Sequence, residues 1–279
     1  MNLGFHRPPQ HLEPFVRRFI VSDYALDREL VVHPWATGNI YLILYYGDLA
    51  NYGVVVNRRS RRFRSPLWLA GQLEYHRVDV VIRRRTAAVV AELTPQAFWR
   101  MFGRPGRWLT GRTCDPADID PRYGALAERH FAVLPDSGDD CCAMLAGFLS
   151  ELAARAGPED AVLARVLGAM QAEHGRITVA ELAVLAGMST RHLTRRFHAI
   201  VGLAPKFYGR VLQINQVIEM MFMPQAGTLA GLAYEGGFYD QAHLNRAMRL
   251  FFSEGPTAFL KSDHKLFRTF LEQEVAAGP

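Results

Sequence analysis

The sequence predicts an α+β fold in two domains, in which β-strands and some helices come first and the last third is all helical. Short segments rich in β-branched and aromatic residues, separated by turns, fill residues 1–115. Apolar residues at helical spacing dominate residues 122–157 and 158–263. Because Gly157-Pro158 ends one helix and precedes the next, we expect domains over 1–157 and 158–263, with a tail over 264–279.

Length and composition are those of a globular protein with room for two cores, since the chain has 279 residues, 49% of them hydrophobic and 21% charged. No stretch approaches 18 apolar residues, and the N-terminus lacks the apolar core of a secretion signal. Three cysteines, Cys114 and the adjacent Cys141 and Cys142, are a poor disulfide framework. We therefore expect a cytoplasmic protein that does not engage membranes.

Five short segments in the first part are predicted as strands of a small barrel or sandwich. They are residues 39–46, 54–56, 67–69, 78–82 and 87–93. Residues 11–21 are an exception, because Leu12, Phe15, Val16 and Phe19 repeat at helical spacing and predict a helix. A second amphipathic helix, around 141–156, either packs on the strands or forms a dimer seam, and its sequence favours neither.

The last third contains a degenerate repeat of a short helix, a glycine turn and a second helix. The pattern of residues 182–197 recurs in residues 232–248. Equivalent positions are 50 residues apart up to Gly187 and Gly237 and 51 residues apart after them, so the second copy has one extra residue in its turn. This is the helix-turn-helix pattern, whose second helix enters the major groove of DNA. Two copies predict two recognition helices on one chain.

Local signals delimit both copies. Thr178 and Glu181 have the spacing of a capping box at the start of the first copy. Ser189 can cap the second helix of that copy, and Asp240 can cap its counterpart. A long helix over 206–223 would join the motifs. The residues expected in the core of the first copy are Leu182, Ala183, Leu185, Leu193 and Phe197.

The outward positions of both second helices carry side chains that can read bases, because Arg donates two hydrogen bonds to guanine and Gln or Asn can pair with adenine. These positions are Arg191, Thr194, Arg195, Gln241, Ala242, Asn245 and Arg246. No acidic residue occurs between Glu181 and Glu219, as expected of a surface that faces phosphates. The predicted phosphate contacts are Ser189, Lys206, Arg210 and Arg249. The alternative is two ordinary helical hairpins with surface arginines.

Residues 177–259 resemble the DNA-binding domain of the AraC/XylS family of bacterial transcription regulators. The pattern Gly-Phe-x-Asp-Gln-x-His-Leu-x-Arg, which begins here at Gly237, is specific to that family. The resemblance implies a seven-helix unit with two motifs joined by a long helix, and it places the base-facing residues on the same seven positions. Gly231, where the family has a branched apolar residue, and Gly209, inside the connecting helix, depart from the family's pattern.

The resemblance also implies a sensing or dimerising domain before residue 158, commonly a small barrel of cupin-like form. His33, Glu74 and His76 do not have the spacing of a cupin metal site, so we predict neither metal nor cofactor. Aromatic residues could line an effector pocket in this domain, with ordinary barrel core as the alternative. The four pocket candidates are Trp35, Tyr41, Tyr46 and Trp68.

The sequence thus predicts a sequence-specific DNA-binding transcription regulator that responds to a small molecule and is not an enzyme. Its expected partners are promoter or operator DNA, a small-molecule effector, a second copy of itself and, for an activator, RNA polymerase. One alternative is a DNA-binding protein without an effector. Another is a DNA-repair alkyl acceptor fused to the same module, but three cysteines without metal-ligand spacing argue against its activated thiol.

Overall fold

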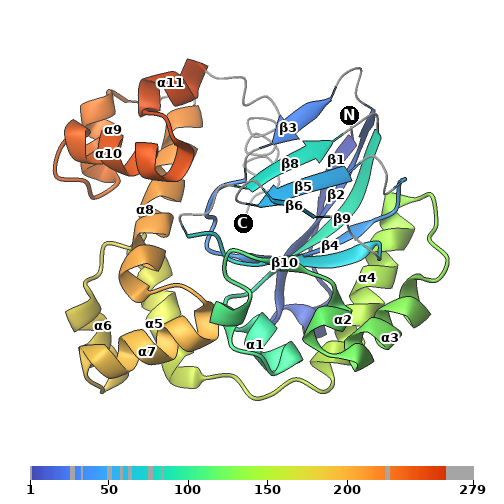
Figure 1. Ribbon diagram of the computed structural model, residues 1–279. Helices are drawn as coiled ribbons and strands as arrows, with labels where there is room; N and C mark the ends of the chain where they lie inside the picture. The colour runs from blue at the N-terminus through green and yellow to red at the C-terminus, as the bar shows by residue number, and fades with distance from the viewer. Residues whose placement is uncertain are drawn as a thin grey trace. The chain divides into compact units, whose positions relative to one another are not determined.

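The structure is a computed structural model that describes residues 2–25, 29–32, 34–48, 52–56, 59–61, 65–74, 78–82, 85–223 and 227–261 (Figure 1). The chain divides into two compact units. The first contains the chain up to Pro34, Asn39–Asp160 and His198–Leu203. The second contains Trp35–Gly38, Ala161–Phe197 and the chain from Ala204 onward. Apart from two short exchanged segments, the chain therefore passes from the first unit to the second after Asp160, two residues after Gly157-Pro158.

The first unit contains two antiparallel sheets, one of six strands in the order β1-β2-β9-β4-β7-β10 and one of four in the order β3-β8-β5-β6. All five predicted strands are confirmed. The strands are β1 (Asn2–His6), β2 (Val16–Ala25), β3 (Leu30–Val32), β4 (Ile40–Tyr45), β5 (Tyr52–Val56), β6 (Arg59–Arg61), β7 (Leu67–Ala70), β8 (Val78–Ile82), β9 (Arg85–Leu93) and β10 (Thr113–Cys114).

Helices cover one face of the six-stranded sheet. They are α1 (Ala97–Phe102), α2 (Pro116–Ile119), α3 (Pro121–Phe131) and α4 (Gly138–Ala153). Within α4, Leu145, Phe148 and Leu149 are fully buried in the core that the helix shares with β2 and β9. The helix predicted around 141–156 therefore packs on the sheet, because its wide apolar stripe is taken up by strand residues.

The predicted helix over residues 11–21 is wrong. A short 3₁₀ turn covers Gln10–Leu12, and β2 begins at Val16. The four apolar residues that suggested a helix are nevertheless all buried in one core. In a regular strand Val16 and Phe19 would face opposite sides, but the register of β2 against β9 shifts between Val16 and Arg18. This bulge brings both side chains to the same face and imitates helical spacing.

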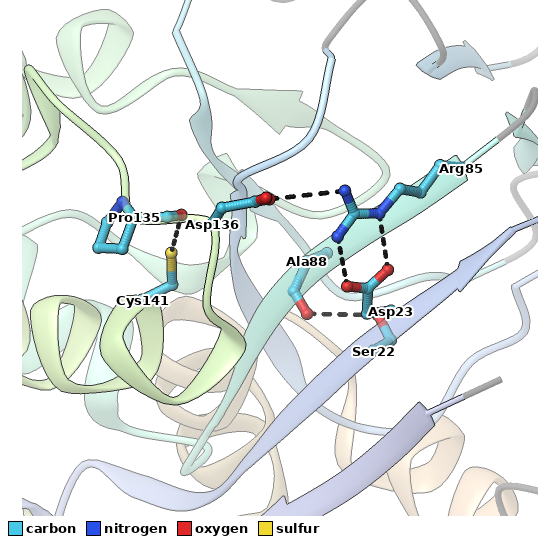
Figure 2. A network of polar contacts seen from close by, with 7 residues as sticks. All are labelled: Ser22, Asp23, Arg85, Ala88, Pro135, Asp136 and Cys141. Atoms are coloured by element: carbon cyan, nitrogen blue, oxygen red, sulfur yellow. Dashed lines mark hydrogen bonds and ion pairs between the residues drawn. The ribbon is translucent and has the colours of Figure 1, made fainter.

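A polar network ties the sheet to the loop before α4 (Figure 2). The Nε and Nη2 atoms of Arg85 donate to the two carboxylate oxygens of Asp23 at 2.9 and 2.6 Å, and its Nη1 lies 3.5 Å from Asp136. The hydrogen bonds from Arg85 lower the pKa of Asp23. The Cys141 thiol donates to the Pro135 carbonyl at 3.3 Å. Arg85 and Cys141 thus both hold the loop that leads into α4.

Among the described residues after Asp160 there are seven helices, the number that the resemblance implies. They are α5 (Ala161–Ala172), α6 (Val179–Ala186), α7 (Thr190–Val201), α8 (Pro205–Phe222), α9 (Leu229–Glu235), α10 (Gln241–Phe252) and α11 (Pro256–Lys261). Figure 1 shows α8 running from the α6–α7 pair to the α9–α10 pair. Throughout the described part of the chain, no helix has the length and apolar character needed to cross a membrane.

Candidate nucleic-acid interface

The first motif consists of α6, a glycine turn and α7. Thr178 Oγ1 accepts from the Glu181 amide at 3.2 Å, and Glu181 Oε2 accepts from the Thr178 amide at 2.8 Å, so the predicted capping box is confirmed. The Thr178 hydroxyl also donates to Glu181 Oε2 at 2.7 Å, and this hydrogen bond, together with the one from the Thr178 amide, lowers the pKa of Glu181. Gly187 ends α6 with φ +65°, a left-handed conformation that suits glycine. Ser189 Oγ then accepts from the His192 amide at 3.3 Å and caps α7 as predicted.

Buried residues hold the two helices of the first motif together. Leu182, Leu193 and Phe197 are fully buried, as the sequence predicts. The prediction for Leu185 is wrong, because this side chain is 42% exposed. Ala183 and Ala186 are buried instead. The buried face of α6 therefore runs through Leu182, Ala183 and Ala186, and Leu185 lies at the exposed edge of that face.

The second motif repeats this construction with α9 and α10. Thr228 Oγ1 accepts from the Gly231 amide at 3.2 Å and caps α9. Gly237 adopts φ +75° in the turn. Asp240 Oδ1 accepts from the His243 amide at 2.6 Å, which confirms the predicted cap of α10. Leu244 and Met248 are fully buried and hold α10 against the rest of the motif.

A cationic and aromatic cluster fixes the turn of the second motif. The guanidinium of Arg210, on α8, lies 5.1 Å from the centre of the Phe238 ring, and His243 meets the same ring edge-on at 5.3 Å. Burial lowers the pKa of Arg210, while burial and the charges of Arg210 and Arg246 lower that of His243. Arg210 Nη1 is buried and has no hydrogen-bond partner within the described residues. A phosphate contact by Arg210 would therefore require its guanidinium to leave the Phe238 ring.

The side chains predicted to read bases all lie on α7 and α10. Arg191, Arg195, Gln241, Ala242 and Arg246 are exposed, and Thr194 and Asn245 are half-buried. Of the predicted phosphate contacts, Ser189, Lys206 and Arg249 are exposed. Both α7 and α10 therefore have a buried face that fixes the helix in its motif and a solvent-facing face that carries hydrogen-bonding groups.

Two features of this region have no counterpart in the sequence analysis. Tyr239 directly precedes Asp240, the cap of α10, and its side chain is 93% exposed. The sequence signal that could have indicated Tyr239 is the extra residue in the turn of the second motif, between Gly237 and Asp240. Arg176 donates from Nε to the Glu173 carbonyl at 3.1 Å and from Nη1 to the Glu235 carbonyl at 3.4 Å. It thereby links the chain before the first motif to the end of α9, and no sequence pattern indicated this long-range bond.

The structure brings two of the four predicted pocket residues to one face of the six-stranded sheet, because Trp68 pairs with Ile43 and Tyr41 lies two residues before Ile43 on β4. Tyr46 belongs to the core under the helices, together with Leu42 and Leu44 of β4. Because side chains alternate along a strand, Tyr41 lies on the opposite face of that sheet. Trp68 alternates in the same way with buried Leu67 and Leu69, and stacks on Tyr45 at 5.2 Å. Trp35 belongs to the second unit, where its Nε1–H donates to Asn215 at 3.3 Å.

The cysteines lack the surroundings of a reactive thiol. Cys114, Cys141 and Cys142 are buried and form no disulfide among the described residues. Burial raises the pKa of both Cys141 and Cys142 to about 11, which disfavours the nucleophilic thiolate. No group of three or more His, Cys, Asp or Glu in the described ranges is placed to hold a metal ion. His33 and His76 lie outside those ranges.

Comparisons with known proteins agree with this construction. Residues 182–262 match the family model of a helix-turn-helix domain, and this domain is of the AraC type. The match covers both motifs from α6 to α11. No curated protein sequence matches the chain.

Three solved structures align with most of the chain at low sequence identity. ToxT from Vibrio cholerae, in a structure with bound unsaturated fatty acid, is 11% identical, with a TM-score of 0.50 over 87% of this chain and 94% of that one. A ligand-free ToxT carrying one substitution is 12% identical, with a TM-score of 0.50 over 87% and 96% of the two chains. The AraC-like transcriptional activator CuxR is 11% identical, with a TM-score of 0.25 over 85% and 99%. The ToxT structures share the two-domain fold, with a strand-rich part followed by a helical one.

Proposed function

We propose that both motifs of this protein read DNA sequence. The premise is that it is a DNA-binding transcription regulator whose residues 182–262 form an AraC-type helix-turn-helix domain. In this proposal α7 and α10 each enter a major groove. The observation that carries it is their shared construction. Each helix has a capped N-terminus, a fully buried face and an exposed face whose side chains could form hydrogen bonds with bases.

The outward residues divide by the base that each suits. Arginines make two hydrogen bonds to guanine, amides pair with adenine, and small apolar groups contact the thymine methyl. Arg191 and Arg195 on α7 would read guanine, with Thr194 beside them. On α10, Gln241 and Asn245 would read adenine, Arg246 guanine and Ala242 a thymine methyl.

The connecting helix α8 sets the distance between the two helix-turn-helix motifs, and therefore between the two blocks of bases that they would contact. With 18 residues at a rise of about 1.5 Å each, α8 spans about 27 Å. Successive major-groove faces of B-DNA lie about 34 Å apart, and side chains can make up the difference. The proposal is therefore one site with two blocks roughly one helical turn apart.

Phosphate contacts would fix the register of the motifs on the duplex. Ser189, Lys206 and Arg249 are the exposed candidates, together with the N-terminal amides of α7 and α10. Tyr239 joins them because its side chain is exposed and it directly precedes Asp240, the cap of α10. Arg210 is the weakest candidate, since it packs on Phe238.

Selection of bound DNA from a random pool, at a stated salt concentration, tests the proposal. We expect an enriched site with two blocks about one helical turn apart. A single enriched block would show that only one motif reads bases. Failure to enrich any sequence, with and without added cell extract, would refute sequence-specific binding.

Lys206→Ala should weaken binding to all DNA sequences alike. A lysine that contacts one phosphate contributes about 0.9 to the slope of log affinity against log salt concentration, so we expect the slope to become shallower by about that amount. Binding titrations at four or more salt concentrations measure it. Arg165→Ala, at an exposed position of α5 outside both motifs, is the matched control and should leave the slope unchanged. An unchanged slope for Lys206→Ala would exclude its phosphate contact.

We also propose that the first unit senses a small molecule. The similar ToxT structure contains a bound unsaturated fatty acid, which makes fatty acids the first ligands to try. A ligand at 100 times its dissociation constant should raise the free energy of unfolding by about 2.7 kcal/mol and should alter affinity for the selected DNA site. A metabolite library without any such ligand would favour a regulator without an effector. A second copy of the chain and RNA polymerase complete the proposed partners.

A further inference from the structure

A cavity of about 440 Å³ lies in the first unit, between α1, α3 and the end of α4. This volume falls within the range of about 300–1,000 Å³ that is usual for small-molecule sites. Its buried apolar lining residues are Met101 from α1, Leu126 from α3 and Leu152 from α4. Because three helices contribute one residue each, the lining exists only when the unit is folded.

Three arginines surround this apolar lining. Arg122 and Arg129 lie two turns apart on one face of α3, and Arg155 follows the end of α4. Arg122 donates from Nε and Nη2 to Asp120 at 3.0 and 2.9 Å, and Arg129 donates to Glu151 at 2.6 Å. No hydrogen bond or ion pair of the Arg155 guanidinium is found within the described ranges. The cavity therefore carries a positive charge that its own carboxylates do not neutralise.

We propose that this cavity binds a small organic anion, a carboxylate or sulfonate carried on an apolar body. The guanidinium of Arg155 would hold the anionic group, because its planar fork matches two oxygens of such a group. Arg122 and Arg129, already oriented by their carboxylate partners, would flank it. The apolar body would cover Leu126 and Leu152. Neither a cation nor an uncharged hydrocarbon would use both the charge and the lining.

The wall of the cavity is held in shape before any ligand arrives. The Tyr123 hydroxyl donates to the Met101 carbonyl at 3.3 Å and so connects α3 to α1. The Tyr123 ring also meets Phe102 edge-on at 5.0 Å. Glu151 accepts from His130 at 2.9 Å as well as from Arg129, which fixes α4 against α3. Such preorganisation lowers the entropic cost of binding a small ligand.

Two fluorescent probes distinguish binding that requires the anionic group from nonspecific hydrophobic binding. The anion 8-anilinonaphthalene-1-sulfonate carries a sulfonate on an aromatic body, and N-phenyl-1-naphthylamine is the same body without the charge. We expect the full-length protein without DNA to bind the sulfonate probe. Arg155→Ala should weaken that affinity at least about tenfold, the equivalent of one charge-assisted hydrogen bond, and should change the affinity for the uncharged probe less than about twofold. Arg107→Ala, at another exposed arginine of the first unit, is the matched control.

A blocking substitution identifies the cavity as the place of binding. Ala125 lines the cavity but is itself exposed, so Ala125→Trp adds bulk there without disturbing the core. We expect it to abolish the anion-dependent binding, whereas Ala132→Trp, at an exposed position just past α3, should retain it. Adding Arg155→Ala to Ala125→Trp should cause no further loss. Thermal unfolding of each variant checks that it is folded.

The outcomes decide the proposal without reference to DNA binding. It is overturned if the wild-type protein does not bind the sulfonate probe, or if Arg155→Ala binds it as tightly as Arg107→Ala does. It is also overturned if both probes lose affinity equally, or if Ala125→Trp still binds. A tenfold loss confined to the anion, together with blocking at Ala125, supports an anion site in this cavity.

Discussion

Arg246→Ala should weaken binding to the selected DNA site by about 1–3 kcal/mol and relax specificity at one base pair. Arg246 is exposed on α10, while Leu244 and Met248 anchor the same helix in the core. Its removal therefore deletes a contact without loosening the helix that presents it. The loss falls on one base pair because a guanidinium makes two hydrogen bonds to a single guanine. Equilibrium titrations at fixed salt, against the selected site and its single-base-pair variants, measure both effects.

Arg249→Ala is the matched control for this prediction. Arg249 is exposed on the same helix, but it is proposed to contact phosphate, so its loss should weaken all sequences alike. An equal loss on every DNA sequence for Arg246→Ala would contradict its base-reading role. Arg195 occupies the equivalent place on α7, and the two motifs are proposed to contact different major-groove segments. The free-energy losses of Arg195→Ala and Arg246→Ala should therefore add to within about 0.5 kcal/mol.

The elements of the two motifs that the sequence predicts correctly are those with local causes. Thr178 and Glu181 satisfy each other's backbone amides across one turn, so their spacing alone identifies the capping box. Asp240 and Ser189 act in the same way, on amides three residues ahead. No distant part of the chain is needed for any of these bonds, which is why the motif boundaries are predictable.

The structure differs from the sequence-based expectations where residues distant in the sequence decide the local structure. The bulge in β2 depends on its pairing with β9, and it turned the strand pattern of residues 16–19 into an apparent helix. Arg210 appears in the sequence as a free cation, but in the structure it packs on Phe238. The sequence suggests that Trp35 belongs with the aromatic residues of the strands, whereas in the structure its Nε1–H donates to Asn215, 180 positions along the chain. Composition and periodicity carry no information about such contacts.

Gly209 and Gly231 show how far the same residue type can differ between sites. Both lie inside helices, where replacing glycine by alanine ordinarily stabilises by about 0.5–1 kcal/mol. A Cβ at Gly231 would meet only Thr228 Oγ1, at an ordinary 3.5 Å. A Cβ at Gly209 would lie 2.9 Å from the backbone carbonyl oxygen of Gly175, which closes the turn after α5. Backbone cannot rotate away as a side chain can, so α8 or that turn would have to move.

We therefore expect opposite signs from one substitution. Gly231→Ala should raise the free energy of unfolding by about 0.5–1 kcal/mol, and Gly209→Ala should lower it by about 1–3 kcal/mol, as overpacking does. Urea unfolding of both variants measures the difference, and a gain in stability for Gly209→Ala would contradict the close approach. Measuring the DNA affinity of these variants then tests whether α8 sets the spacing of the two motifs, because a displacement of α8 at Gly209 would change their separation. Gly209→Ala should accordingly lose more affinity for DNA with both blocks than for DNA with one block, whereas Gly231→Ala should bind both as the wild-type protein does.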